Sequence, residues 1–340
     1  MKKAEALLRE APICSLLGIT WPVLQAGMGQ VAYGDLVGEV SAAGGLGVLG
    51  AGYMSGDELR GEIRKVRART DRPFGVDILF GQVQSDDQGS QRYSQRVEDQ
   101  IEVSLDERVP VLISGLGNPS GVIPRAHALG IKVMSVVGNA RQARQVVADG
   151  VDAVIASGAE GGGHVGRVGT ATLVPMVVDA VAAIRKVPVI AGGGLADGRG
   201  LAAAFALGAC GAWMGTRFIA TREARGHDHY KNRIVAIDEE GTVVTRGHSG
   251  KPCRLIRNRF TEYWEAHPEQ IQPFPKQMVE VGEPATLRGR LEGDIENGVL
   301  PAGQSSGLIH GVIGAGDVVA QVVAEAIDTF ERLGVGQIGK

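Results

Sequence analysis

The chain has 340 residues, of which 44% are hydrophobic and 21% charged, and its formal net charge is −3. This composition is globular, and the absence of a basic tract argues against a nucleic-acid partner. No apolar run approaches the ~18 residues that span a membrane, and the first residues hold no apolar segment of signal-peptide length. Three scattered cysteines are too few for a disulfide framework or a zinc site. We therefore expect a soluble, cytoplasmic protein with reduced thiols, no metal and no membrane partner.

Eight short runs rich in Val, Ile, Leu and Ala recur through the first two-thirds of the chain. Nearly continuous apolar runs of this kind are typical of parallel strands that are buried on both faces. Their starts are spaced as successive β-α units would be. The predicted strands cover residues 22–27, 46–52, 73–80, 109–117, 131–138, 152–158, 188–194 and 211–218.

Helical patterns lie between these runs. Ser55 followed by Glu58 predicts a helix that begins with a capping box. Another helix is predicted to begin near Asp197, and apolar helical spacing returns at residues 317–333. Eight units predict an α/β fold of the (β/α)₈ TIM-barrel type, because a parallel sheet closes at that number. The alternative, a doubly wound sheet, is rejected because no G-x-G-x-x-G follows the first strand.

The regular alternation breaks after the eighth strand. Residues 225–300 are polar, mixed in charge and richer in His, Pro and Arg. We predict a barrel over residues 1–224, an excursion over 225–300, and closing helices in 301–340. An excursion placed at the C-terminal ends of the strands would cover the site as a lid.

Glycines mark the ends of the seventh and eighth predicted strands. In barrels of this kind the active site lies at the C-terminal strand ends, and these two loops commonly hold a phosphate. Glycine lets backbone N–H groups approach an anion, and the helix that begins near Asp197 would aim its N-terminal dipole the same way. The candidate phosphate residues are Gly192, Gly193, Gly194, Gly215 and Thr216.

Two further glycine-rich loops follow the first and sixth strands. Gly27 and Met28 leave room for a flat ring across the barrel mouth, where the methionine would supply a soft apolar contact. Gly162 and Gly163 clear a space that His164 enters. A histidine exchanges protons near neutral pH, so His164 is the candidate catalytic residue.

Eight motifs in order resemble the nitronate monooxygenase family, formerly called 2-nitropropane dioxygenases, and the related flavin-dependent enoyl-acyl-carrier-protein reductases. They are QAGMG, AGGLGVLG, PFGVDI, GLGNP, EGGGHVGR, PVIAGGG, GTRF and AGQSSG. The resemblance implies FMN at the barrel mouth and a catalytic role for His164. It also implies that the isoalloxazine lies near Gly27 and Met28, the ribityl or phosphate region beside Gly162 and Gly163, and the phosphate on Gly192, Gly194, Gly215 and Thr216.

The chain departs from the family pattern at two positions. Asp77 stands where the family usually has asparagine, which keeps an acceptor for a flavin ring N–H but loses an amide donor. A carboxylate there would also add charge near a ring that becomes anionic on reduction. Ser157 stands where a glutamine or glutamate often precedes the glycine run.

Several other side chains have a weaker case. A carboxylate such as Glu160 at a strand end is expected to bind backbone or Arg groups, and Arg167 is open between a substrate contact and a solvated charge. Ser305 has no adjacent base in sequence, which argues against a hydrolase triad. The remaining expectations are packing for Cys210 and surface positions without metal-ligand spacing for His227, His229 and His248.

Two flavin reactions fit these residues. In the favoured one, a nitronate passes an electron to FMN and O₂ completes its oxidation. In the alternative, NAD(P)H reduces FMN, which then reduces an enoyl thioester of acyl-carrier protein or CoA. A barrel that binds a sugar phosphate is disfavoured, because the strand ends carry no Lys or paired acids. The expected partners are the small substrate and O₂, and a homodimer stays open.

Overall fold

The structure, a computed structural model, describes residues 3–81, 84–85 and 91–335. Eight parallel strands form the central sheet in the order β1-β11-β10-β8-β7-β6-β3-β2. A parallel bridge between Leu24 and Leu46 joins the two edge strands, so the sheet closes into a barrel. Each predicted run contains one of these strands, and the TIM-barrel prediction is confirmed. The strands are β1 (Val23–Gln25), β2 (Gly47–Gly50), β3 (Phe74–Phe80), β6 (Val111–Gly117), β7 (Lys132–Val137), β8 (Ala153–Ser157), β10 (Val189–Gly192) and β11 (Ala212–Met214).

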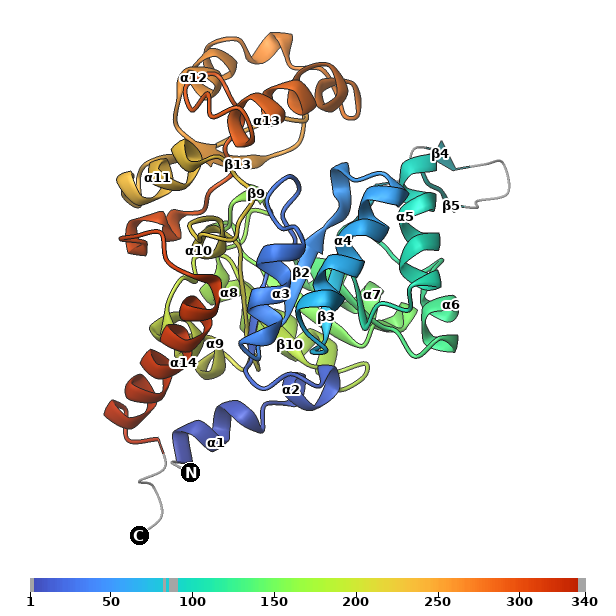
Figure 1. The fold of residues 1–340 in the computed structure, drawn as a ribbon, viewed down its shortest axis with the longest axis vertical. Coiled ribbons are helices and arrows are strands. Elements are labelled where there is room, and N and C mark those ends of the chain that lie inside the picture. Colours follow the sequence, from blue (N-terminus) through green and yellow to red (C-terminus); the bar gives the residue numbers. More distant parts are fainter. Residues whose placement is uncertain (1–2, 82–83, 86–90, 336–340) are drawn as a thin grey trace.

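Helices surround the barrel between successive strands (Figure 1). The last of them, α14, packs beside α9, where the rings of Phe205 and Phe330 meet edge to face at 5.8 Å. The helices around the barrel are α3 (Gly34–Ala42), α4 (Gly56–Arg69), α5 (Gln95–Asp106), α6 (Ile123–Ala128), α7 (Ala140–Asp149), α8 (Thr170–Ala182), α9 (Gly198–Ala206), the short α10 (Thr216–Ile219) and α14 (Ala315–Arg332). Single-turn helices η1 (Ala51–Tyr53) and η4 (Gln304–Leu308) and the hairpin β4 (Gln84–Ser85) and β5 (Gln91–Arg92) lie in the loops.

The start of α4 confirms one half of the predicted capping box. The hydroxyl of Ser55 accepts a hydrogen bond from the backbone N–H of Glu58 at 3.2 Å. The carboxylate of Glu58, however, accepts a hydrogen bond from the hydroxyl of Tyr33 at 3.1 Å. A tertiary partner therefore replaces the reciprocal bond that a capping box would make.

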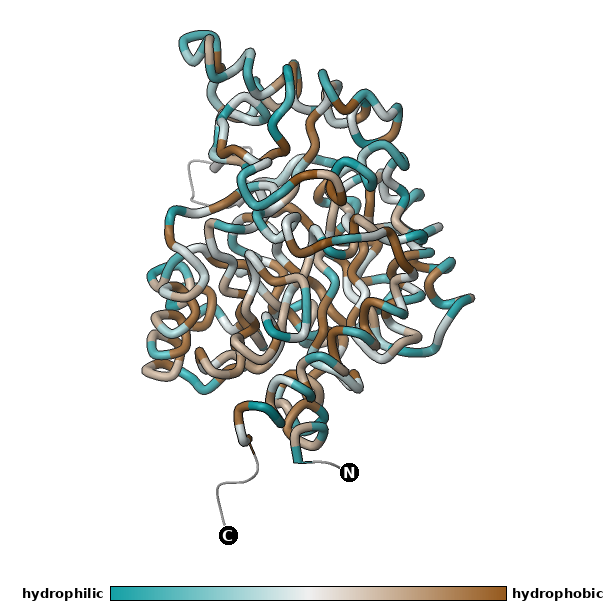
Figure 2. The backbone as a smooth tube through the Cα atoms, turned by 90° about the vertical axis from the view of Figure 1, so that its left-hand side faces the viewer, coloured by the Kyte–Doolittle hydropathy of each residue, from teal (hydrophilic) through white to brown (hydrophobic). Residues whose placement is uncertain are grey.

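Side chains fill the barrel interior. Along β8, Ile155 belongs to the interior cluster, whereas Val154 belongs to the layer between sheet and helices. This alternation follows from the two-residue period of a strand. Ile13 and Leu17 of α2 (Pro12–Leu17), which follows α1 (Lys3–Arg9), join the interior cluster from the chain start. The barrel interior is therefore a packed core rather than a pore. In Figure 2, segments of hydrophobic residues run through the centre of the molecule.

Residues 225–300, called the cap below, lie above the barrel (Figure 1). The cap has a core of its own, in which Cys253, Leu255, Ala285 and Val299 are buried together. Its sheet has the order β12-β13-β9, and β9 belongs to the loop after β8 rather than to the cap. The elements are β9 (Gly163–His164), α11 (Asp228–Ala236), β12 (Thr242–Thr245), β13 (Cys253–Ile256), α12 (Arg259–Ala266), the 3₁₀ turn η2 (Pro268–Gln270), the π-helical turn η3 (Met278–Gly282) and α13 (Glu283–Arg290).

Among the described residues, no helix combines the length and apolarity needed to cross a bilayer.

Candidate active site

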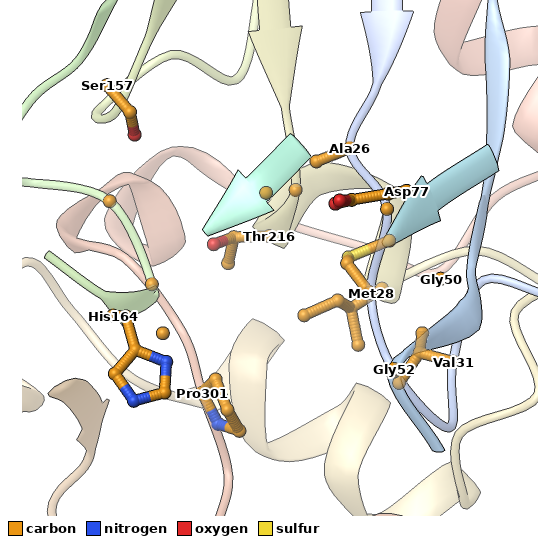
Figure 3. A pocket seen from close by; sticks show the side chains of 18 of the residues that line it. Ala26, Met28, Val31, Gly50, Gly52, Asp77, Ser157, His164, Thr216 and Pro301 are labelled. Carbon is orange, nitrogen blue, oxygen red and sulfur yellow. The ribbon is translucent and has the colours of Figure 1, made fainter. Parts of the chain in front are cut away.

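One cavity lies between the C-terminal strand ends and the cap (Figure 3). It brings together the loops that follow β1, β2, β8, β10 and β11 and side chains from α11, β13 and α13. Gly192 is not part of its lining; the carbonyl of this residue accepts hydrogen bonds from Gly158 N–H at 2.9 Å and Thr170 Oγ1 at 3.3 Å. The other predicted site residues all line the cavity, namely Gly27, Met28, Asp77, Gly162, Gly163, His164, Gly193, Gly194, Gly215 and Thr216.

The loops after β10 and β11 offer backbone donors to the cavity. Gly193 and Gly194 have φ angles of +93° and +74°, a region that favours glycine, and a side-chain carbon on Gly193 would lie 2.8 Å from the carbonyl oxygen of Gly158. Within the described part of the chain, the N–H groups of Gly193, Gly194 and Gly215 meet no protein acceptor. A cluster of free amide donors on glycines is the chemistry that binds a phosphate.

The N-terminus of α9, which was expected to support that phosphate, binds two carboxylates of the protein itself. At the start of α9, Gly200 N–H donates to the Asp197 carboxylate at 3.0 Å and Gly198 N–H to the Glu325 carboxylate at 2.9 Å. Two carboxylates therefore already satisfy this helix N-terminus. Glu325 reaches this helix start from α14, so these two N–H groups are not free for a ligand phosphate, and the predicted contribution of the helix dipole stays a prediction.

Asp77 lies on β3 and is buried at the cavity wall. Its Oδ1 has no hydrogen-bond partner among the described residues. Burial raises the pKa of this carboxyl well above its usual value, and a backbone hydrogen bond from Gly115 only partly opposes that shift. A side chain at Gly27 would collide with Asp77, so glycine is what allows this close approach. The raised pKa favours the protonated form of this carboxyl, which carries a donor as well as an acceptor.

His164 stands on β9, across the cavity from Asp77 in Figure 3. Its Nε2 lies 2.7 Å from the hydroxyl of Ser249, a fully buried cap residue. His164 is exposed to the cavity, yet the surrounding protein desolvates its charged form. This desolvation, followed by the charges of Lys251 and Arg290, lowers the pKa of His164 to about 4. The imidazole is therefore neutral at physiological pH and can accept a proton or a hydrogen bond.

His248 corrects a sequence expectation, because it is not at the surface. It is 3% exposed, and its ring centre lies 5.6 Å from that of His164. Burial, then the neighbouring His164 and Arg290, lowers the pKa of His248 well below its usual value. The cap closes over it: Gln277 donates to Gly247 O at 2.6 Å, and Thr286 Oγ1 lies 3.4 Å from His248 Nε2. These tertiary contacts leave no signal in local sequence.

Of the other histidines in this segment, His227 is half-buried and His229 is exposed, as expected for residues near the surface.

Cys253 was also missed by sequence reasoning. It lies opposite His164 in the β13–β9 ladder, and ligand atoms of His164, His248 and Cys253 lie within 4.8 Å of one another. Nitrogen and sulfur donors are those of zinc sites. Here, however, burial raises the pKa of the Cys253 thiol to about 12, and Lys251 and Arg290 place positive charge beside the histidines. The electrostatics of this wall favour an anion over a cation.

The weaker candidates have structural contacts. The Glu160 carboxylate accepts hydrogen bonds from Thr170 N–H and Oγ1 at 2.9–3.0 Å, which fixes the glycine loop to the start of α8. Arg167 is exposed, and the thiol of Cys210 donates to Val189 O at 3.4 Å. Ser305 is buried at the cavity edge, and none of the hydrogen bonds between described residues joins it to a histidine.

Known proteins resemble the chain over nearly its whole length. It is 35% identical to a Mycobacterium tuberculosis protein named (3aS,4S,5R,7aS)-5-hydroxy-7a-methyl-1-oxo-octahydro-1H-indene-4-carboxyl-CoA dehydrogenase, over 93% of this chain and 96% of that one. It is 33% identical to a probable nitronate monooxygenase of Staphylococcus aureus, over 78% and 83% of the two chains.

Solved structures share the architecture as well. FabK from Thermotoga maritima has 39% sequence identity and a TM-score of 0.86, covering 97% of this chain and 99% of that one. Nitroalkane oxidase from Streptomyces ansochromogenes has 29% identity and a TM-score of 0.83, covering 94% and 99%. The family model described as nitronate monooxygenase matches residues 10–325. The chain therefore belongs to the nitronate monooxygenase family of flavin oxidoreductases.

Proposed function

We propose that the chain is an FMN-dependent enzyme that oxidises alkyl nitronates with O₂. The observation that supports this most is a single cavity that holds a neutral histidine, a buried carboxyl oxygen without a partner and a loop of free amide donors. Each of these groups matches a different part of a flavin site. A nitronate is an anion, and the positive charge of Arg290 in the cavity lining suits it.

The residues present fit FMN. The phosphate would accept hydrogen bonds from the free N–H groups of Gly193, Gly194 and Gly215 and from Thr216, and Gly192 would support this loop from within β10. The ring would lie against Gly27 and Met28, with Asp77 beside a ring nitrogen or oxygen, and the ribityl chain beside Gly162 and Gly163. A single phosphate cradle favours FMN over FAD. When bound, FMN supplies the electron acceptor that passes electrons on to O₂.

His164 is the proposed catalytic residue. As a neutral imidazole it would orient the nitro group of a nitronate, or take the α-proton of a nitroalkane. Ser249 holds its Nε2 edge, which directs the rest of the ring to the cavity.

We propose that the cap, residues 225–300, acts as a lid that excludes water from a barrel built from residues 1–224 and 301–340. Arg254 donates two hydrogen bonds to Ala159 O at 3.0 and 3.1 Å, which supports this role by joining cap and catalytic loop.

A second candidate is an enoyl-thioester reductase. The relative most similar among the solved structures described above is FabK, an enoyl-acyl-carrier-protein reductase, and one sequence relative is named as a dehydrogenase of a CoA thioester. In this reading NAD(P)H would reduce the flavin and an enoyl thioester would reoxidise it. His164 would then donate to the thioester product instead of binding a nitro group.

Anaerobic stopped-flow spectroscopy of the flavin separates these readings. The oxidised enzyme is mixed with ethylnitronate, with propionate 3-nitronate, with NADH or with NADPH, and flavin absorbance is followed. We expect fast reduction by a nitronate and slow reduction by either nicotinamide. Fast reduction by NAD(P)H followed by reoxidation with crotonyl-CoA, without reduction by a nitronate, would establish the reductase instead.

A further inference from the structure

Arg290, the last residue of α13, is a buried cation on the cap side of the cavity. It is 7% exposed and lines the cavity. Its Nη1 donates to the carbonyl oxygen of Gly29, in the loop after β1, at 2.6 Å. Its Nε has no hydrogen-bond partner among the residues that the structure describes. Among the ion pairs of the described residues, none includes Arg290.

A buried guanidinium without a counter-ion is costly. Moving a charge out of water is unfavourable unless an opposite charge and hydrogen bonds compensate for it. The charge of Arg290 acts on His164, His248 and Cys253 and on the lining tyrosines Tyr53 and Tyr230. Burial raises the pKa of the thiol and of both phenols, so none of these groups is anionic at neutral pH. Asp77 is the acid in the lining, and burial raises its pKa, which disfavours its charged form. Within the part of the chain that the structure describes, the cavity therefore carries a positive charge here that no carboxylate pairs with.

We expect the free amide donors of the β10 and β11 loops to hold the FMN phosphate. Arg290, which Gly29 fixes to the neighbouring β1 loop, is then left for a second anion. The free Nε–H edge belongs to a planar fork that pairs with two-oxygen anions. Nitronates and carboxylates are both planar anions with two oxygens on one atom.

We propose that Arg290 binds the negatively charged group of the substrate and so selects planar two-oxygen anions at the cap side of the cavity. This inference rests on the proposed flavin enzyme and names the residue that recognises the substrate. Because Gly29 O occupies Nη1, the guanidinium is already oriented before the anion arrives. Little conformational entropy is lost on binding, which makes the ion pair effective.

The test compares propionate with propionamide, two probes of nearly the same shape that differ in charge. Each is titrated into the flavin-loaded enzyme, and the change in the flavin spectrum gives its dissociation constant. In Arg290→Met, propionate binding should weaken roughly 10- to 150-fold, the range for a lost charge-assisted hydrogen bond. Propionamide binding should change less than about twofold. Arg290→Lys should recover part of the propionate affinity.

Lys251→Met is the matched control. It removes the same charge from the same region, but Lys251 lies over the ring of Phe274 at 4.0 Å and does not line the cavity. Lys251→Met should change the dissociation constant of propionate by less than about threefold, as expected for a screened charge that does not touch the ligand.

Three results would overturn the proposal. Equal weakening of both probes in Arg290→Met would mean that the arginine only supports the cap. Propionate that fails to bind the wild type, or binds both proteins equally, would mean that the site takes no anion. If Arg290→Met shifts the reduction potential of the flavin but leaves propionate binding unchanged, the charge of Arg290 stabilises the reduced flavin rather than the substrate anion. The test needs no turnover, so an enzyme inactive on nitronates that still shows Arg290-dependent propionate binding would refute only the proposed function.

Discussion

Replacing Asp77 by asparagine tests the neutral buried carboxyl directly. The substitution keeps the shape of the side chain and makes it permanently uncharged. Burial raises the pKa of Asp77 well above its usual 3.8, so the folded protein keeps a proton that the unfolded chain releases. For one proton, wild-type stability then falls by about 1.4 kcal/mol per pH unit between the unfolded and the folded pKa.

The direction of this pH dependence follows from the state that binds the proton. Below the unfolded pKa, Asp77 is protonated in both the folded and the unfolded state, and its burial costs the wild type no stability through ionisation. As the pH rises toward the folded pKa, only the unfolded state releases the proton, and the free energy of unfolding falls. Asp77→Asn has no such proton. Its stability relative to the wild type should therefore increase with pH between the unfolded and the folded pKa, with a slope that approaches about 1.4 kcal/mol per pH unit.

The measurement is urea unfolding of both proteins after removal of flavin, at several pH values from the ordinary aspartate pKa to neutrality. Circular dichroism and tryptophan fluorescence should give coincident transitions, which is required for a two-state free energy. Infrared difference spectra just above the ordinary aspartate pKa should also show a protonated carboxyl band in the wild type that is absent from Asp77→Asn. A stability difference that does not change with pH, or the absence of that band, would refute the reasoning.

The remaining predictions concern the flavin and His164. The purified protein should release FMN on denaturation, and chromatography that shows FAD would contradict the single phosphate cradle. Thr216→Glu should weaken FMN binding in a fluorescence titration, because a carboxylate would meet the phosphate; unchanged affinity would move the phosphate elsewhere. His164→Ala should retain FMN but lower nitroalkane turnover by roughly 10²–10⁴-fold, and nitronate turnover less, since a nitronate has already lost its α-proton. Because the pKa of His164 is lowered to about 4, nitronate turnover in the wild type should show no ionisation near the ordinary 6.5 in a pH profile and should fall only as pH approaches 4.

The barrel could be predicted from sequence because its signal is local. Each buried parallel strand is a short apolar run, and the number of runs determines closure. The glycines at the ends of β10 and β11 were predicted for the same reason, since their position in the repeat assigns them to the catalytic face. Ser157, a departure from the family pattern, lines the cavity as well.

The site's cap side could not be predicted, because it depends on distant pairings. Ser249 holds His164 from 85 positions away in the chain. Cys253 pairs opposite the same histidine through a ladder of two residues, too short to leave a pattern. His248 and Arg290 are polar residues in a polar segment, and only the packing of α13 makes them part of the cavity wall. The raised pKa of Asp77 likewise follows from burial, which composition does not reveal.

The strand β9 makes the catalytic loop a structural part of the cap. His164 pairs with Cys253 in the β9–β13 ladder, and Arg254 donates two hydrogen bonds to the carbonyl of Ala159 in the same loop. A rigid-body rotation of the cap would break these bonds or move His164 together with the cap. Substrate and product must therefore enter and leave the cavity while β9 remains paired with β13. Exchanging caps between relatives would meet the same constraint: a graft that leaves residues 158–168 behind would separate the histidine from two strands of its own sheet.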